Sequence, residues 1–260
     1  MLKRLLLLIT LSLLAAPIWS QTVEEKGLEI ATETDRRDTG FGDFTAKMSM
    51  LLKNKQGEES LRTMHSKSME VTGDGDKTMI VFGEPKDVKG TALLTYTHKS
   101  DSDDQWLYLP ALKRVKRIAS RNKSGPFMGS EFAYEDLSSQ EVEKYTYKFI
   151  EETELNGDPM FLIERDPVDK YSGYTRQLVW INKVEYRPEQ IEFYDRKNSL
   201  LKTLTFKKYQ KYLGQFWRAE EMFMINHQTE KTTLLTWKDY KFGNGFSEND
   251  FKKNSLKRAK

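Results

Sequence analysis

The sequence FTAKMSMLL at residues 44–52 alternates apolar and polar side chains with a period of two. The even-numbered positions are all apolar, whereas Thr45, Lys47 and Ser49 between them are polar. Successive side chains of a strand point to opposite faces of a sheet, so this pattern predicts a strand with one buried face. A turn at residues 54–57 and a second run at residues 60–71 complete a predicted antiparallel hairpin.

The apolar runs that follow are also short, and turn residues separate nearly all of them. Asn156-Gly157 between two such runs is the strongest short hairpin signal in the sequence. We expect about eleven strands, joined mostly by short turns rather than by crossover helices. The chain is therefore predicted to be mainly β, with one strongly curled antiparallel sheet.

Helices are predicted only at the two ends and in one loop. Thr22-Val23-Glu24-Glu25 has the capping-box pattern and predicts a helix over residues 23–35. Ser247 should cap a short helix at residues 248–256. Residues 119–139 read as a long loop, with a short helix near residues 138–144, and loops of this length are usually functional or disordered.

The first twenty residues have the layout of a secretory signal peptide. Lys3 and Arg4 precede an apolar run from Leu5 to Ala16, and Pro17 ends that run. An uncleaved membrane anchor is the alternative, but the run is shorter than the roughly 20 residues of a span. We expect residues 21–260 to form one exported domain. The chain has no cysteine, so it contains no disulfide and is not itself a lipoprotein.

Composition and motifs argue against several function classes. The net charge of +3 falls to +1 without Lys3 and Arg4, and the charges are mixed along the chain, which does not indicate nucleic-acid binding. His65, His98 and His227 are isolated, so neither a metal site nor a cofactor is predicted. No nucleophile elbow, phosphate loop or dinucleotide fingerprint occurs, and we therefore do not expect an enzyme.

Several predicted strands are apolar on both faces. They include the runs at residues 106–109, 161–163 and 222–225. A single strand of this kind can be an ordinary buried strand. Several together indicate a curled sheet whose inner wall is apolar, and such a sheet can enclose a small hydrophobic ligand.

Three sequence blocks resemble the outer membrane lipoprotein-sorting protein family of the LolA-like group. They are Phe82-x-x-Pro85-x-Asp87-x-x-Gly90-Thr91-Ala92-Leu93-Leu94, then Gln105-Trp106-Leu107-Tyr108-Leu109-Pro110, then Gly129-Ser130-x-Phe132-x-Tyr134-Glu135-Asp136-Leu137. The resemblance implies an incomplete, curled antiparallel β-barrel with helices covering its open side. It also implies a hydrophobic concave face that receives acyl chains.

The resemblance further implies a carrier that moves lipidated cargo across the periplasm, from an inner-membrane transporter to the outer membrane. Members of this branch often accompany exporters of the RND type (MMPL-like), which would be the partner. A sensor or an exporter-docking module of the same fold is the alternative. LolA itself has an arginine that ties its lid, but Lys86 follows Pro85 here, so no residue matches that arginine.

Two groups of residues are candidates for the site. The first should line the cavity or form its lip: Met48, Met50, Trp106, Tyr108, Phe127, Met128, Phe132, Tyr134, Met222 and Met224. The second should lie at the rim and dock on anionic headgroups or a transporter: Lys113, Arg114, Lys116 and Arg117. For these cations, protection of an exposed strand edge is the alternative interpretation.

Overall fold

The computed structural model describes residues 21–259, and the predicted signal peptide at residues 1–20 lies outside this range. The predicted N-terminal helix is confirmed as α1 (Val23–Asp38). The Thr22 side chain accepts a hydrogen bond from the Glu25 amide at 3.1 Å, and the Glu25 carboxylate accepts one from the Thr22 amide at 2.9 Å. This capping box satisfies amides that would otherwise lack partners at the start of the helix.

The described residues form one antiparallel sheet of thirteen strands, more than the eleven or so expected. Its strands are β1 (Asp43–Lys53), β2 (Glu59–Met69), β3 (Lys77–Glu84), β4 (Ala92–Tyr96), β5 (Asp104–Leu109), β6 (Arg114–Ile118), β7 (Tyr145–Leu155), β8 (Asp158–Pro167), β9 (Tyr174–Asn182), β10 (Pro188–Asp195), β11 (Leu200–Tyr212), β12 (Phe216–Asn226) and β13 (Thr232–Phe242). Strand β6 was not counted among the expected strands because its apolar residues do not alternate, although an exposed strand edge was the alternative interpretation of its cations.

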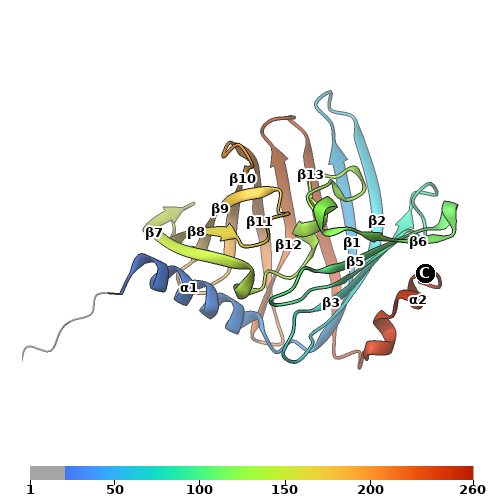
Figure 1. The fold of residues 1–260 in the computed structure, drawn as a ribbon, viewed down its shortest axis with the longest axis horizontal. Coiled ribbons are helices and arrows are strands. Elements are labelled where there is room, and N and C mark those ends of the chain that lie inside the picture. Colours follow the sequence, from blue (N-terminus) through green and yellow to red (C-terminus); the bar gives the residue numbers. More distant parts are fainter. Residues whose placement is uncertain (1–20, 260) are drawn as a thin grey trace, which may run out of the picture.

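The strand order is β6-β5-β4-β3-β2-β1-β13-β12-β11-β10-β9-β8-β7. Two meanders, β1 to β6 and β7 to β13, therefore meet where β1 pairs with β13. The sheet curls strongly but does not close, because β6 and β7 remain at its two edges (Figure 1). The mainly β fold with an incomplete barrel is confirmed.

The chain passes from β6 to β7 through a segment that we call the covering loop (residues 119–144). It contains only single 3-10 turns: η2 (Ser120–Asn122), η3 (Phe127–Gly129), η4 (Tyr134–Leu137) and η5 (Val142–Lys144). The helix expected near residues 138–144 is thus reduced to one turn. Phe127 and Phe132 are buried in the core on the concave side of the sheet, so the loop packs onto this side.

Helix α1 lies across the same side and contacts mainly β7 (Figure 1). Gly27 permits this close approach, since a Cβ atom there would lie 2.8 Å from the backbone carbon of Lys148. The C-terminal turn η6 (Glu248–Phe251) and helix α2 (Lys253–Leu256) pack on the opposite, convex side instead. The expectation that helices cover the open side therefore holds for α1 but not for α2.

Two apolar cores result from the alternation of side chains along β3. Ile80 and Phe82 face the concave core, whereas Met79 and Val81 face a smaller convex core with Phe251. Within residues 21–259, no helix combines the length and the hydropathy that a bilayer crossing requires.

Candidate functional site

A cavity of about 1550 Å³ lies among the concave face of the sheet, α1 and the covering loop. Ligand pockets for small molecules usually measure about 300–1,000 Å³, so this cavity can hold a long or branched ligand. Its apolar lining comes from many strands and from the covering loop: Ile80, Phe132, Ile163, Val179, Ile181, Ile191, Phe193, Leu204, Phe206, Ala219, Met222 and Leu235.

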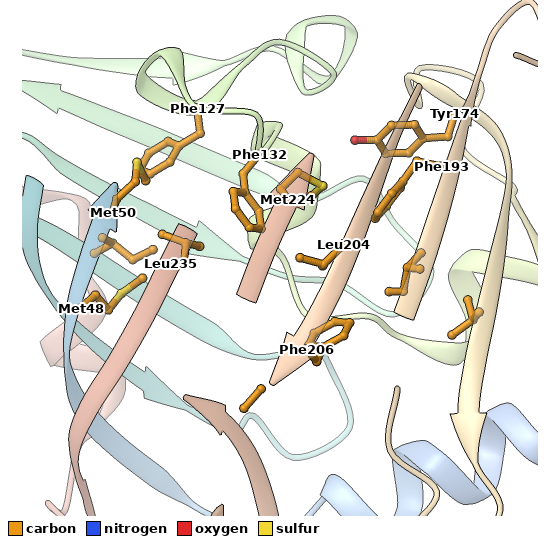
Figure 2. Close-up of a cluster of buried hydrophobic side chains, with 14 of the residues drawn as sticks. Met48, Met50, Phe127, Phe132, Tyr174, Phe193, Leu204, Phe206, Met224 and Leu235 are labelled. Atoms are coloured by element: carbon orange, nitrogen blue, oxygen red, sulfur yellow. The ribbon is translucent and has the colours of Figure 1, made fainter. Parts of the chain in front are cut away.

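Neighbouring strands β9, β10 and β11 build the apolar wall by alternation. Each strand contributes a pair of apolar side chains separated by one residue, and the register places Ile191 beside both Val179 and Leu204. Figure 2 shows Phe193, Leu204 and Phe206 side by side on this wall. These residues were not among the candidates predicted from the sequence, although the period-two pattern in each strand could have revealed them.

The entrance to the cavity is polar and carries charges of both signs. It includes the end of α1 and the turns at residues 99–103 and 167–172. Burial and the nearby carboxylate of Glu141 raise the pKa of Asp76 to about 7. Burial also raises the pKa of Glu141, and the carboxylate of Asp35 adds to this effect.

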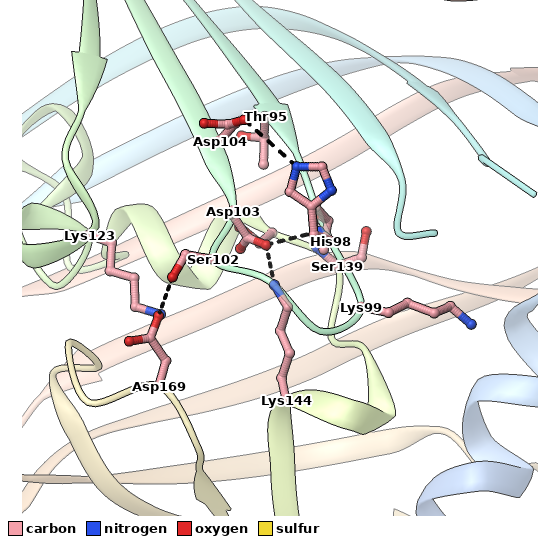
Figure 3. Close-up of polar contacts among 12 residues, drawn as sticks. Thr95, His98, Lys99, Ser102, Asp103, Asp104, Lys123, Ser139, Lys144 and Asp169 are labelled. Carbon is pink, nitrogen blue, oxygen red and sulfur yellow. Dashed lines mark hydrogen bonds and ion pairs between the residues drawn. The ribbon is translucent and has the colours of Figure 1, made fainter. Parts of the chain in front are cut away.

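Ion pairs join the covering loop to both turns at the entrance. Lys144 pairs with Asp103, and Lys123 pairs with Asp169 at 2.7 Å (Figure 3). These four side chains are mostly buried, which strengthens their attraction compared with pairs in bulk water. The loop is therefore fixed at two points beside the entrance.

A third and more deeply buried ion pair holds the middle of the covering loop. The ammonium group of Lys202 on β11 donates to Asp136 Oδ2 at 2.6 Å and to the Glu131 carbonyl at 3.0 Å. Tyr174 donates its hydroxyl to Asp136 Oδ1 at 2.8 Å. The Lys202 and Asp136 side chains are only 4% and 5% exposed.

The candidate lining residues have different positions. Phe132 and Met222 line the cavity. Four others are buried in the concave core beside it, where Figure 2 labels them: Met48, Met50, Phe127 and Met224. Met128 and Tyr134 are partly buried against the same core. The concave side thus holds eight of the ten candidates, but most of them pack against protein rather than the cavity.

Trp106 and Tyr108 require a correction, because both lie on the convex side. Trp106 is buried with Phe251 and Leu256, and the Lys253 ammonium lies 4.5 Å from the centre of its ring. Leu107, between the two, faces the concave core instead. Because all four residues of this run are apolar, alternation could not show which side faces inward.

The four candidate cations lie on β6 and at the turn before it, and none of them lines the cavity. Their predicted position at the cavity rim is therefore wrong. All four are exposed at an edge of the sheet, where Arg117 forms an ion pair with Asp104. The strand order explains this position: β6 is the edge strand next to β5, whereas the cavity wall of β9–β11 belongs to the other half of the sheet.

Comparisons with known proteins agree with this architecture. A family model described as "Uncharacterized protein" matches residues 74–258. The crystal structure of an outer membrane lipoprotein-sorting protein domain from Vibrio parahaemolyticus has 59% sequence identity and a TM-score of 0.89, covering 90% of this chain and 100% of that domain. The chain belongs to the outer membrane lipoprotein-sorting protein family.

Two more distant structures extend the comparison. A DUF1329 family protein from Desulfovibrio piger is 27% identical with a TM-score of 0.86, covering 90% of this chain and 99% of its own. A LolA superfamily protein from Nitrosomonas europaea is 19% identical with a TM-score of 0.71, and the match covers 88% of this chain and 98% of that protein's chain. The similarity to the latter shows that this chain shares the fold of that protein. A search of curated proteins gave no match.

Proposed function

We propose that the protein is a periplasmic carrier that binds the acyl chains of lipids or lipoproteins in its cavity and moves them between membranes. The observation that carries this proposal is the apolar wall of the 1550 Å³ cavity on the concave face. An exposed methylene group costs about 0.8 kcal/mol in water, so an apolar cavity suffices to hold an acyl chain. No bond is made or broken in this function, which assigns the protein no catalytic residue.

The distribution of polarity in the cavity sets the orientation of such a ligand. Acyl chains would lie along β9–β11, while a polar headgroup or a lipidated N-terminus would remain at the charged entrance near residues 99–103 and 167–172. Burying the apolar part and leaving the polar part in water avoids unpaired polar groups inside the cavity.

The family and the predicted signal peptide support a route for the carrier between the two membranes. An inner-membrane exporter of the RND type would load the ligand, and the outer membrane would receive it. Direction then depends on the difference in affinity between donor and acceptor, since a ligand shifts an equilibrium only by its differential affinity. A pull-down that recovers a signalling protein instead of an exporter would favour a sensor of the same fold.

Two measurements test the binding step. Native mass spectrometry of the purified protein should show bound lipid, and a fluorescent fatty acid should bind and be displaced by unlabelled lipid. Ala219 lines the cavity, so Ala219→Phe should fill part of it and weaken binding of the probe. Thr205→Phe is the matched control, because it adds the same ring to neighbouring β11 outside the cavity.

Equal probe binding by both variants would contradict binding in this cavity. Absence of both co-purified lipid and probe binding in the unmodified protein would remove the carrier proposal.

A further inference from the structure

The hairpin that joins β5 to β6 presents an apolar tip to solvent. Its turn, η1 (Pro110–Leu112), ends at Lys113, which adopts a left-handed conformation with φ of 50°. Leu112 at this tip is 64% exposed, which places it among the most exposed large apolar side chains of residues 21–259. Leu112 belongs to neither of the two apolar cores.

Cations surround this exposed leucine. Between Gln105 and Ser130 the sequence contains no Asp or Glu, but it contains Lys113, Arg114, Lys116, Arg117, Arg121 and Lys123. Within the described residues, carboxylates pair with Arg117, through Asp104, and with Lys123, through Asp169. Lys113, Arg114, Lys116 and Arg121 are exposed and have no carboxylate within ion-pair distance in this part of the chain.

Protection of a strand edge explains only part of this arrangement. Edge strands discourage unwanted pairing with charged side chains, lysine in particular. The opposite edge strand, β7, exposes Glu151, Glu152 and Glu154 instead of a run of cations. Cations can protect the edge at β6, but edge protection relies on charged side chains, so the exposed apolar Leu112 at the tip does not follow from it.

We propose that the β5–β6 hairpin docks the protein on the surface of an anionic phospholipid bilayer. Lys113, Arg114, Lys116 and Arg117 contact the lipid phosphates, and Leu112 enters the interfacial region beneath them. Basic residues next to a membrane surface gain affinity from anionic headgroups, and one apolar side chain adds a hydrophobic contribution. This surface lies outside the cavity, so the inference extends the carrier proposal to the way in which the carrier meets a membrane.

Co-sedimentation with vesicles tests the charge requirement. The protein should bind vesicles that contain phosphatidylglycerol more tightly than vesicles of phosphatidylcholine alone, and added salt should weaken this binding. The variant with Lys113, Arg114, Lys116 and Arg117 changed to Gln should lose about tenfold or more in affinity. The matched control instead changes four exposed cations outside the hairpin, all of them lysines, to Gln: Lys197, Lys207, Lys231 and Lys238.

The control variant has the same net charge, so it should keep most of the affinity if the hairpin is the docking surface. Equal losses in the two variants would show a nonspecific charge effect and overturn the proposal. Equal binding of the unmodified protein to both kinds of vesicle would also overturn it, and an acidic protein surface would then be the better partner for the hairpin.

Leu112 provides a second, independent readout. The chain has no cysteine, so Leu112→Cys allows one environment-sensitive dye to be attached at the tip. Its emission should shift to shorter wavelength on anionic vesicles, whereas a dye that remains in water would contradict insertion. The four-residue hairpin variant should still bind the fluorescent fatty acid, which separates failure of docking from failure of the carrier proposal.

Discussion

The buried ion pair between Lys202 and Asp136 yields the sharpest prediction about stability. Replacing Lys202 by Met removes the cation but leaves the Asp136 carboxylate in place, with 5% of its side chain exposed. Removing one partner of a buried pair typically costs about 3–5 kcal/mol. Because the Tyr174 hydroxyl and the Ala133 amide still donate to Asp136, we expect a loss near the lower end, about 3 kcal/mol.

Urea unfolding followed by circular dichroism measures this loss, and the double variant Lys202→Met, Asp136→Asn measures the coupling. The double variant should lose less than the sum of the single variants, by about 0.5–3 kcal/mol. Lys208→Met is the matched control, since Lys208 also pairs with a carboxylate, that of Glu221 at 2.6 Å, but its side chain is 65% exposed. It should cost less than about 1 kcal/mol.

The reasoning predicts a local effect as well. Amides of the covering loop should exchange faster with deuterium in Lys202→Met, because Lys202 connects this loop to β11. Additive losses in the double variant, within about 0.5 kcal/mol, would refute the view that the pair stabilises the loop.

Three further predictions concern α1 and the entrance to the cavity. Thr22→Ala should lower the free energy of unfolding by about 1 kcal/mol, measured by urea titration, because the capping hydrogen bond is lost. Gly27→Ala improves helix propensity but places a Cβ atom 2.8 Å from the Lys148 backbone, so the thermal unfolding midpoint of this variant should fall. An unchanged midpoint would show that α1 can shift to make room for the added Cβ atom. Asp76 binds its proton more tightly in the folded protein than in the unfolded chain, whose carboxyl pKa is 3.8. Stability should therefore fall as the pH rises from about 4 to about 7, and Asp76→Asn should flatten this decline in urea midpoints.

Local patterns predicted the elements of this fold well. Asn156 and Gly157 both have positive φ, at 56° and 90°, as a tight hairpin turn requires, and the turn lies between β7 and β8 as expected. The capping box at Thr22 and the alternation along β1 could also be predicted from the sequence, because each depends only on neighbouring residues. Signals of this range determine where strands begin and which side chains share a face.

Properties that depend on distant parts of the chain were not predictable in this way. In the run at residues 106–109 both faces are apolar, so the sequence could not show that Trp106 belongs to the convex core. Lys202 gives no sign in the sequence that it is buried, because its partner Asp136 lies 66 residues away. The same holds for the cavity wall, which exists only once β9, β10 and β11 lie side by side.

The strand order has a consequence for the way this chain folds. Each meander consists of hairpins between neighbouring strands, which require only short loops to close. Pairing β1 with β13 instead joins Leu51 to Leu234, across most of the chain, and such distant contacts carry the largest entropic cost of closure. The central seam of the sheet should therefore form last. Because the cavity is lined from both meanders, a nascent chain gains its ligand-binding surface only at this final step.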